Sequence, residues 1–331
     1  IVIHFSRAID EIIEYLTKDE ERPSYNEEIL EVWKRRSPLY KQCSKFEFIC
    51  PKDHSGKTLW PQVTFQFCQF VENLITGKYI HLDSSLRPAP LARAITSDYP
   101  SYFVCLTFKN LYDAGDDRIR VVTEGVSAIE LRVDQLESQD TEFVSTQISK
   151  LRSISNLPII FTIRTTKQGG AFDFNEETIL NLYQLAIRIG MDYIDIEQQW
   201  PEKLKSKLYS ILDNSKIRNQ RTSKVIVSEH CYEPNLTESS IQHIMGLCKE
   251  RGQSDIIKVV TKANTIDDTL TLRRAVSSYK TNKPLIALAT STNGQLSRIL
   301  NEYLCPVTHP LLPVAAAPGQ LTVQQINSAR P

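Results

Sequence analysis

Short apolar runs separated by helical segments make up the chain after Pro100. The eight runs are YFVCLTF (102–108), AIELRVD (128–134), LPIIFTIR (157–164), YIDIE (193–197), KVIVSEH (224–230), DIIKVV (255–260), PLIALAT (284–290) and CPVTH (305–309). Near-continuous apolar runs are typical of parallel strands buried on both faces. Intervening segments such as EETILNLYQLAIRIG (176–190) repeat apolar residues at three- and four-residue spacing, which predicts helices.

Eight repeats of strand and helix favour an α/β fold closed into a (β/α)8 barrel, the TIM barrel. The structural alternative is an open, doubly wound parallel sheet. The sequence has no GxGxxG after the first of these strands and no GxxxxGK[ST] anywhere, so nucleotide-binding folds are disfavoured.

The first hundred residues have a different pattern. Apolar residues recur with helical spacing in AIDEIIEYL (8–16), NEEILEVWKRR (26–36) and VTFQFCQFVENLITG (63–77), so from Arg7 to about Gly77 we expect helices and no strands. Residues 49–61 have the composition of a loop, and 81–100 that of a linker. We therefore expect a helical appendage at 1–95, the barrel at 96–325 and a tail at 326–331 leading toward a following domain.

Composition excludes several classes of protein. Apolar residues make up 41% of the 331 positions and charged residues 24%, which is ordinary for a globular protein. Lys plus Arg (39) equals Asp plus Glu (39), so the chain has no net positive charge to attract nucleic acid or an anionic membrane. No run of 18 apolar residues is present, and neither nucleic acid nor membrane is an expected partner.

Seven cysteines are scattered without a CxxC pair, which predicts buried free thiols and a reducing, cytoplasmic location. No His or Cys spacing indicates a metal site, so we expect no metal. The chain starts without Met inside an apolar run, and we expect it to be a piece of a longer polypeptide.

Polar and charged residues cluster where the predicted strands end, which is where barrel active sites lie. Strand ends or the segments after them supply Glu130, Arg132, Asp134, Arg164, Asp195, Glu197, His230, Lys258 and Arg298. Each has a simpler interpretation: a lone His after a strand often caps a loop, and Glu, Arg and Asp commonly form a buried ion-pair network.

Lys258 is harder to explain in this way, because DIIKVV should be buried throughout. An unpaired ammonium in an apolar environment usually responds by a lowered pKa. A lysine with a depressed pKa is what a Schiff-base nucleophile requires, since only the neutral amine attacks a carbonyl. Carbonyl chemistry and a structural salt bridge both remain open from the residues alone.

Several motifs occur in the order and spacing of one family. AIELRVD, PIIFTIRTTKQGG, YIDIE, SEH, SDIIKVV, GQLSRILN and AAAPGQLT resemble type I 3-dehydroquinate dehydratase over about residues 100–325. Upstream, RPSYNEEILEVWKRRSPLYKQCS resembles the C-terminal end of the shikimate kinase domain that precedes this dehydratase in the arom polypeptide. The kinase P-loop is absent from this chain, so no kinase activity is expected.

The resemblance implies roles for individual residues. Lys258 would form an imine with the C3 ketone of 3-dehydroquinate, and His230 would remove the C2 proton. Arg298 would bind the substrate carboxylate. The remaining substrate-binding or supporting positions would be Glu130, Arg132, Arg164 and Gln320. The imine itself serves as the electron sink, so no cofactor is implied, and members of the family are often dimers.

Five positions depart from the family pattern and would alter the pocket. Gln168 stands where bacterial relatives carry Glu, and Cys231 replaces the usual Asp after the histidine. Thr290 and Ser291 replace a Met-Gly pair, and Ala316 stands where some relatives have a polar side chain.

Two further hypotheses remain, of which the first follows from these departures. One is a quinate-pathway repressor, which resembles the same region, would sense a metabolite of the 3-dehydroquinate, quinate or shikimate type without turnover, would engage an activator protein, and could be nuclear. The other is that the first hundred residues form a helical docking surface, with the barrel as scaffold. The pairing of a buried lysine with a histidine favours the enzyme.

Overall fold

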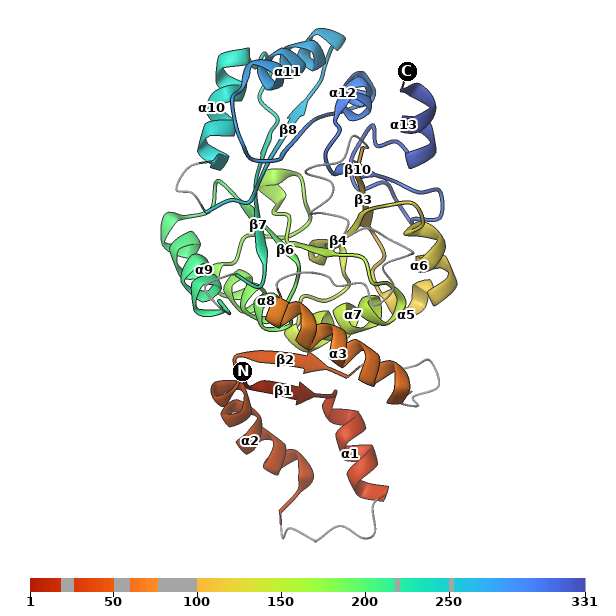
Figure 1. Cartoon of the computed structure of the whole chain (residues 1–331), viewed down its shortest axis with the longest axis vertical. Coiled ribbons are helices and arrows are strands. Elements are labelled where there is room, and N and C mark those ends of the chain that lie inside the picture. Colours follow the sequence, from red (N-terminus) through yellow and green to blue (C-terminus); the bar gives the residue numbers. More distant parts are fainter. Residues whose placement is uncertain (19–26, 51–59, 77–99, 218–220, 250–252, 331) are drawn as a thin grey trace.

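The computed structural model describes residues 1–18, 27–50, 60–76, 100–217, 221–249 and 253–330 (Figure 1). The predicted linker and most of the predicted loop at 49–61 lie outside these residues. Among the described residues, no helix is both long enough and apolar enough to cross a membrane.

All eight predicted strands are present in one parallel sheet. They are β3 (Tyr102–Leu106), β4 (Ala128–Arg132), β5 (Ile159–Thr162), β6 (Tyr193–Glu197), β7 (Lys224–Cys231), β8 (Ile256–Lys262), β9 (Leu285–Thr290) and β10 (Cys305–Val307). The hydrogen-bonded order is β10-β3-β4-β5-β6-β7-β8-β9, so chain neighbours are sheet neighbours except that β10 pairs with β3. The last strand, β10, thus lies beside the first strand of the sheet, β3, as in a (β/α)8 barrel. The barrel prediction is confirmed.

Helices alternate with the strands and cover the outside of the sheet (Figure 1). They are α5 (Leu111–Ala114), α6 (Asp116–Val122), α7 (Thr141–Ile154), α8 (Glu176–Arg188), α9 (Glu202–Asn214), α10 (Glu238–Lys249), α11 (Ile266–Ser278), α12 (Gln295–Leu300) and α13 (Val323–Ala329). One cluster of buried apolar side chains joins strands and helices from Tyr102 to Ile326. The boundary predicted after residue 325 falls inside α13, and the packed unit continues through this helix.

The N-terminal unit lies beside the helical layer of the barrel (Figure 1). It consists of β1 (Ile3–Ser6), α1 (Ile9–Lys18), α2 (Ile29–Cys43), β2 (Phe46–Ile49) and α3 (Trp60–Thr76). The three helices are confirmed, but the prediction of no strands was wrong, because β2 pairs in parallel with β1. The alternating run Phe46–Ile49 is short, and it forms a strand because it pairs with Ile3–Ser6 at the start of the chain.

Polar contacts fix the N-terminal unit against the barrel. Arg188 of α8 donates to the carbonyl of Ser44 at 2.8 Å and to its hydroxyl at 2.9 Å. Ser149 of α7 donates to the carbonyl of Ile49 at 3.1 Å. Both helices are on the outside of the barrel, so these contacts hold the N-terminal unit against its outer face.

All seven cysteines are free thiols. Four are buried, as predicted: Cys50, Cys105, Cys248 and Cys305. The prediction was wrong for the other three, because Cys43 and Cys68 are exposed and Cys231 is half-buried.

Candidate active site

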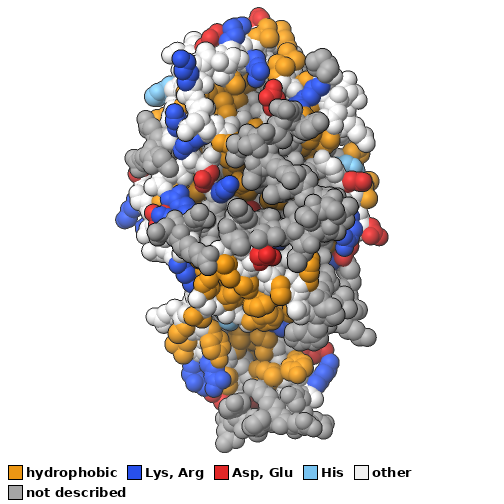
Figure 2. Space-filling view, in the orientation of Figure 1, with side chains coloured by type: hydrophobic (Ala, Val, Ile, Leu, Met, Phe, Trp, Pro, Cys, Tyr) orange, Lys and Arg blue, Asp and Glu red, His pale blue; other side chains and the backbone are white. Residues whose placement is uncertain are grey.

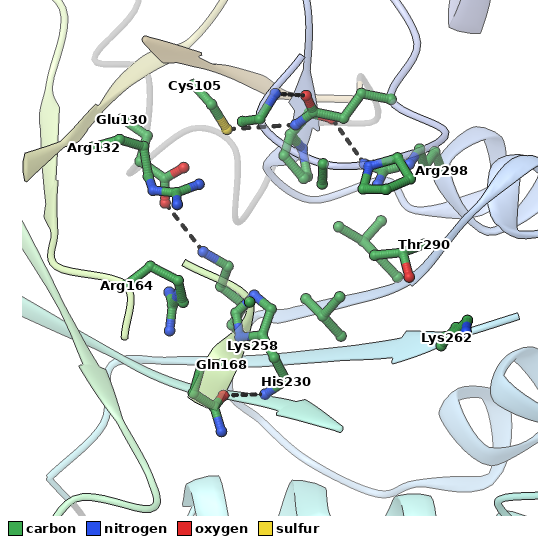
Figure 3. Close-up of a pocket in the computed structure, with 18 of the residues that line it drawn as sticks. Cys105, Glu130, Arg132, Arg164, Gln168, His230, Lys258, Lys262, Thr290 and Arg298 are labelled. Atoms are coloured by element: carbon green, nitrogen blue, oxygen red, sulfur yellow. Dashed lines mark hydrogen bonds and ion pairs between the residues drawn. The ribbon is translucent and has the colours of Figure 1, made fainter. Parts of the chain in front are cut away.

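A cavity of about 430 Å³ opens at the carboxyl ends of the barrel strands (Figure 3). It gathers ten of the residues singled out in the sequence: Glu130, Arg132, Arg164, Gln168, His230, Lys258, Thr290, Arg298, Ala316 and Gln320. Residues two apart on a strand point to the same side, which brings Glu130 and Arg132 of β4 into the cavity together. Cys231 is absent from the lining, since it follows His230 directly and faces the other way.

Lys258 lies deep in the cavity between two carboxylates. Its Nζ is 2.9 Å from Asp195 Oδ2 and 3.2 Å from Glu130 Oε1, and the side chain is almost fully buried. Burial alone would lower the pKa of Lys258, but Asp195 and Glu130 outweigh it and the pKa is raised. The expectation of a depressed pKa was therefore wrong for the resting site, because the lysine is paired.

A buried network extends from this pair along neighbouring strands. Arg164, which follows β5, bonds Asp195 at 2.8 Å and Glu197 at 3.1 Å, and donates to the Ser228 hydroxyl at 2.9 Å. Burial opposes ionisation of Asp195, yet Arg164 and Lys258 bring its pKa down to about 2. Asp195 is thus an anion at neutral pH that holds both cations. The sequence interpretation named Asp195 and Glu197 as strand-end residues but gave neither a role in the site.

His230 faces the same cavity from β7, the strand next to Lys258 (Figure 3). Ser228 is paired in register with Lys258, so His230 lies one pleat nearer the mouth. Burial and the charges of Arg164, Lys258 and Arg132 hold the pKa of His230 well below its usual value. The imidazole is therefore neutral at pH 7, and its Nδ1 has no hydrogen-bond partner among the described residues. A neutral imidazole of this kind can accept a proton from a bound molecule.

Arg298 enters the cavity from α12 and is 1% exposed. One guanidinium nitrogen donates to the Pro306 carbonyl at 3.2 Å, and Nε has no partner among the described residues. Burial lowers the pKa of Arg298, and no carboxylate of the described residues forms an ion pair with it. Because a buried guanidinium is costly without an anion, this end of the cavity suits a ligand carboxylate.

Arg132 and Gln320 line the cavity but are held by protein partners. Arg132 forms a two-pronged pair with Asp134, at 2.8 and 2.7 Å. Gln320 Oε1 accepts the Ala316 main-chain N–H at 2.9 Å, and its Nε2 lies 3.6 Å from Cys105 Sγ. Both side chains are thereby fixed in place, with their remaining donors available to a ligand.

The altered positions have distinct settings. Thr290 is buried in the wall and donates to the Thr261 carbonyl at 3.2 Å, so its hydroxyl is satisfied within the protein. The next residue, Ser291, has φ 82°, a left-handed conformation that a glycine adopts more readily. Gln168 is 1% exposed and contacts the end of β7.

The cavity also contains residues that sequence reasoning missed. Tyr232, Cys105, Phe103 and Lys262 line it. Lys262 had a detectable signal, since it lies at an even spacing from Lys258 on β8 and so shares its face. Within the described residues, no group of three or more His, Cys, Asp and Glu side chains is arranged to hold a metal ion.

Comparison with known proteins identifies the barrel. Residues 102–330 match the family model of type I 3-dehydroquinase. The chain is 39% identical over 333 residues to the pentafunctional AROM polypeptide of Lachancea thermotolerans and 40% identical over 340 residues to that of Candida glabrata. These alignments cover 99% and 98% of this chain but only 19% of each relative, so the chain spans about a fifth of those multidomain polypeptides.

Solved structures agree. A dehydroquinate dehydratase and shikimate dehydrogenase structure from S. pombe AroM matches with TM-score 0.66 and 36% identity, covering 73% of this chain and 46% of that one. A type I 3-dehydroquinate dehydratase from Clostridium difficile matches with TM-score 0.62 and 22% identity, covering 70% of this chain and 91% of that one, which supports the fold. On the family model and these alignments, the chain belongs to the type I 3-dehydroquinase family.

Proposed function

We propose that the barrel dehydrates 3-dehydroquinate to 3-dehydroshikimate through an imine on Lys258. The observation that carries this proposal is that an amine, a neutral imidazole and a buried guanidinium without a carboxylate partner among the described residues line one cavity. A keto acid with a hydroxyl next to its acidic carbon uses all three groups. The substrate named by the family fits this description.

The chemistry divides between two residues. Lys258 loses its proton and adds to the C3 carbonyl, and water leaves to give a protonated imine. His230 takes the proton from C2, and the electron pair moves to the imine nitrogen to form an enamine. The enamine expels the C1 hydroxyl as water, with the proton that His230 returns. Hydrolysis of the new imine releases the product and the free lysine.

Other residues bind and orient the substrate in this proposal. Arg298 takes the carboxylate, because its buried guanidinium lacks another anion among the described residues. Arg132, Glu130 and Gln320 are directed at the ring hydroxyls. Arg164 supports the site from behind, since it already holds Asp195 and Glu197. The proposal needs no cofactor.

The direct test is turnover, followed by the absorbance of the conjugated product. We expect product from the wild-type chain and a loss of at least about a hundredfold in kcat for His230→Asn, while that variant still forms the imine. His243→Asn on α10, outside the cavity, is the matched control. Failure of the folded wild-type chain to form any product would refute the proposed activity.

The repressor hypothesis receives no support from the reported matches, and neither an activator protein nor a nuclear location is proposed. Of the five altered positions that suggested a sensor, Cys231 lies outside the lining, and the Thr290 hydroxyl is satisfied by the main chain. We propose that the reaction occurs in the cytoplasm. A homodimer stays a prediction.

We also propose that the N-terminal unit is the C-terminal part of a shikimate-kinase-like domain in a longer polypeptide. Its parallel pair β1–β2 supports this, together with the exposed apolar side chains of Ile1, Val2 and Phe5 (67%, 58% and 45%). Figure 2 shows hydrophobic atoms gathered over this end of the molecule.

Deletion of residues 1–99 tests this division and the docking-surface hypothesis together. The barrel has its own buried cluster, so we expect kcat to stay within about twofold, while the melting temperature falls because the contacts of Arg188 and Ser149 are lost. A folded barrel that lost turnover would contradict the assignment of function to the barrel alone.

A further inference from the structure

A chain of side-chain hydrogen bonds leads from the main chain of His230 through Gln168, which lines the cavity, to Glu229, which does not. The main-chain N–H of His230 donates to Gln168 Oε1, and Gln168 Nε2 donates to Glu229 Oε1 at 3.2 Å. Gln199 also donates to that oxygen of Glu229. Gln168 is 1% exposed and Glu229 is 5% exposed. The three polar side chains come from separate segments and converge on the strand end that presents the histidine.

We propose that Glu229 is a positioning residue for the dehydration: it fixes the amide of Gln168, which in turn anchors the main chain of His230. This inference rests on the proposed function, because it assigns Glu229 a part in the proton-transfer step. Glu229 is not in the cavity lining, so it touches no substrate.

The main-chain N–H of His230 has no hydrogen-bond acceptor on the neighbouring strand β6. Pairing between β6 and β7 ends at Glu197 opposite Ser228, two residues before His230. Residues two apart on a strand direct their N–H groups to the same side, so the His230 N–H points beyond the end of β6. Gln168 Oε1 supplies the acceptor that the next residue of a longer β6 would have provided.

Glu229 determines the orientation of the Gln168 side-chain amide. An amide presents an acceptor on one side and donors on the other, and its orientation follows from its neighbours. The oxygen of Glu229 accepts, so the NH2 group turns to Glu229 and the carbonyl oxygen to the His230 N–H. Without that acceptor, the amide could turn and place its NH2 against another N–H.

The anchor matters because the imidazole has little else to hold it. Its Nδ1 has no partner among the described residues, so the direction of the ring depends on the main chain that carries it. Tyr232, the second residue after His230, adds a second contact between the end of β7 and Gln168, because its hydroxyl donates to the Gln168 carbonyl at 3.2 Å. A shift of about 1 Å in a proton-transfer group can lower the rate a hundredfold.

The first test compares Glu229→Met, which removes the acceptor at similar length, with Glu229→Gln, which keeps an acceptor oxygen. We expect Glu229→Met to lower kcat about ten- to a hundredfold, with the borohydride-trapped adduct on Lys258 retained, and Glu229→Gln to stay within about threefold of wild type. Glu233→Met, at an exposed position shortly after β7, is the control and should leave kcat unchanged. Equal losses in the Met and Gln variants, or none in Glu229→Met, would overturn the proposal.

A second test remains informative if Glu229→Met does not fold. Gln168→Glu sets two carboxylates against each other and should lower kcat, whereas Gln168→Glu with Glu229→Gln restores one donor and one acceptor at that contact. We expect the double variant to exceed Gln168→Glu at least about tenfold in kcat. Absence of this recovery would refute the hydrogen-bond chain as the cause.

Different results would refute the dehydration and the positioning role of Glu229. A wild-type chain that forms neither product nor adduct would refute the proposed dehydration. A wild-type chain that turns over, with Glu229→Met equally active, would refute only the positioning role.

Discussion

The ammonium group of Lys258 lies 2.9 Å from the carboxylate of Asp195, and this buried ion pair sets the resting state of the site. Asp195 in turn is shared with Arg164 at 2.8 Å, so it cannot move toward the lysine without weakening a second pair. The amine is therefore held in position and protonated. Imine formation then depends on removing one proton from a group whose pKa is raised.

This electrostatic arrangement predicts a pH dependence for adduct formation. Below the raised pKa of Lys258, the neutral fraction grows about tenfold per pH unit, so the rate of borohydride trapping should rise from pH 6 to 9. Glu130→Gln removes one of the carboxylates that raise this pKa, and should move the profile toward lower pH. Glu142→Gln, an exposed change on α7, should not move it. An unshifted profile in Glu130→Gln would contradict the role of that carboxylate.

Arg298 should govern substrate affinity more than the chemical step. Its buried guanidinium meets no carboxylate among the described residues, so Arg298→Gln should raise KM about ten- to a hundredfold and change kcat much less. Arg273→Gln on α11, outside the cavity, provides the matched control for steady-state kinetics. If KM stayed the same, the substrate carboxylate would have to bind elsewhere.

Ser291 should show an inverted preference between glycine and alanine. Its φ of 82° is strained for any residue with a side chain, so Ser291→Gly should be more stable to unfolding than Ser291→Ala by about 1–2 kcal/mol. At the exposed helical position Ser206 the order should reverse, with Ala about 1 kcal/mol more stable than Gly. Urea denaturation of the four variants measures both differences. The same order at the two positions would show that Ser291 is not strained.

The strands were predictable because each is a nearly continuous apolar run between helical segments, as in the run from Ile256 to Val260. The strand Phe46–Ile49 was missed, since four alternating residues between a helix and a loop carry little signal. It exists because Ile3–Ser6, more than forty residues earlier, pairs with it.

The site was predictable only in part. Period-two spacing shows that Glu130 and Arg132 share a face, and the same rule places Cys231 on the face opposite His230. The pairing of Lys258 with Asp195 could not be derived, because it joins strands 63 residues apart. For that reason a buried lysine was expected to have a depressed pKa, whereas its partner raises it.

The two roles of the end of β7, one on each face, were also not predicted from the sequence. SEH reads as one polar strand end, yet His230 faces the cavity while Glu229 faces the Gln168 loop. The structure shows the reason for Gln168: β6 ends opposite Ser228, so the His230 N–H needs an acceptor from outside the sheet.

The imine on Lys258 is the central claim, and the most direct test is to trap it. The wild-type chain is incubated with 3-dehydroquinate, reduced with borohydride and digested, and the peptides are weighed by mass spectrometry. The account predicts one reduced adduct, on the peptide containing Lys258, and none in Lys258→Met, whose side chain fills a similar volume without an amine. An adduct on another lysine, or an adduct that persists in a folded Lys258→Met variant, would contradict it.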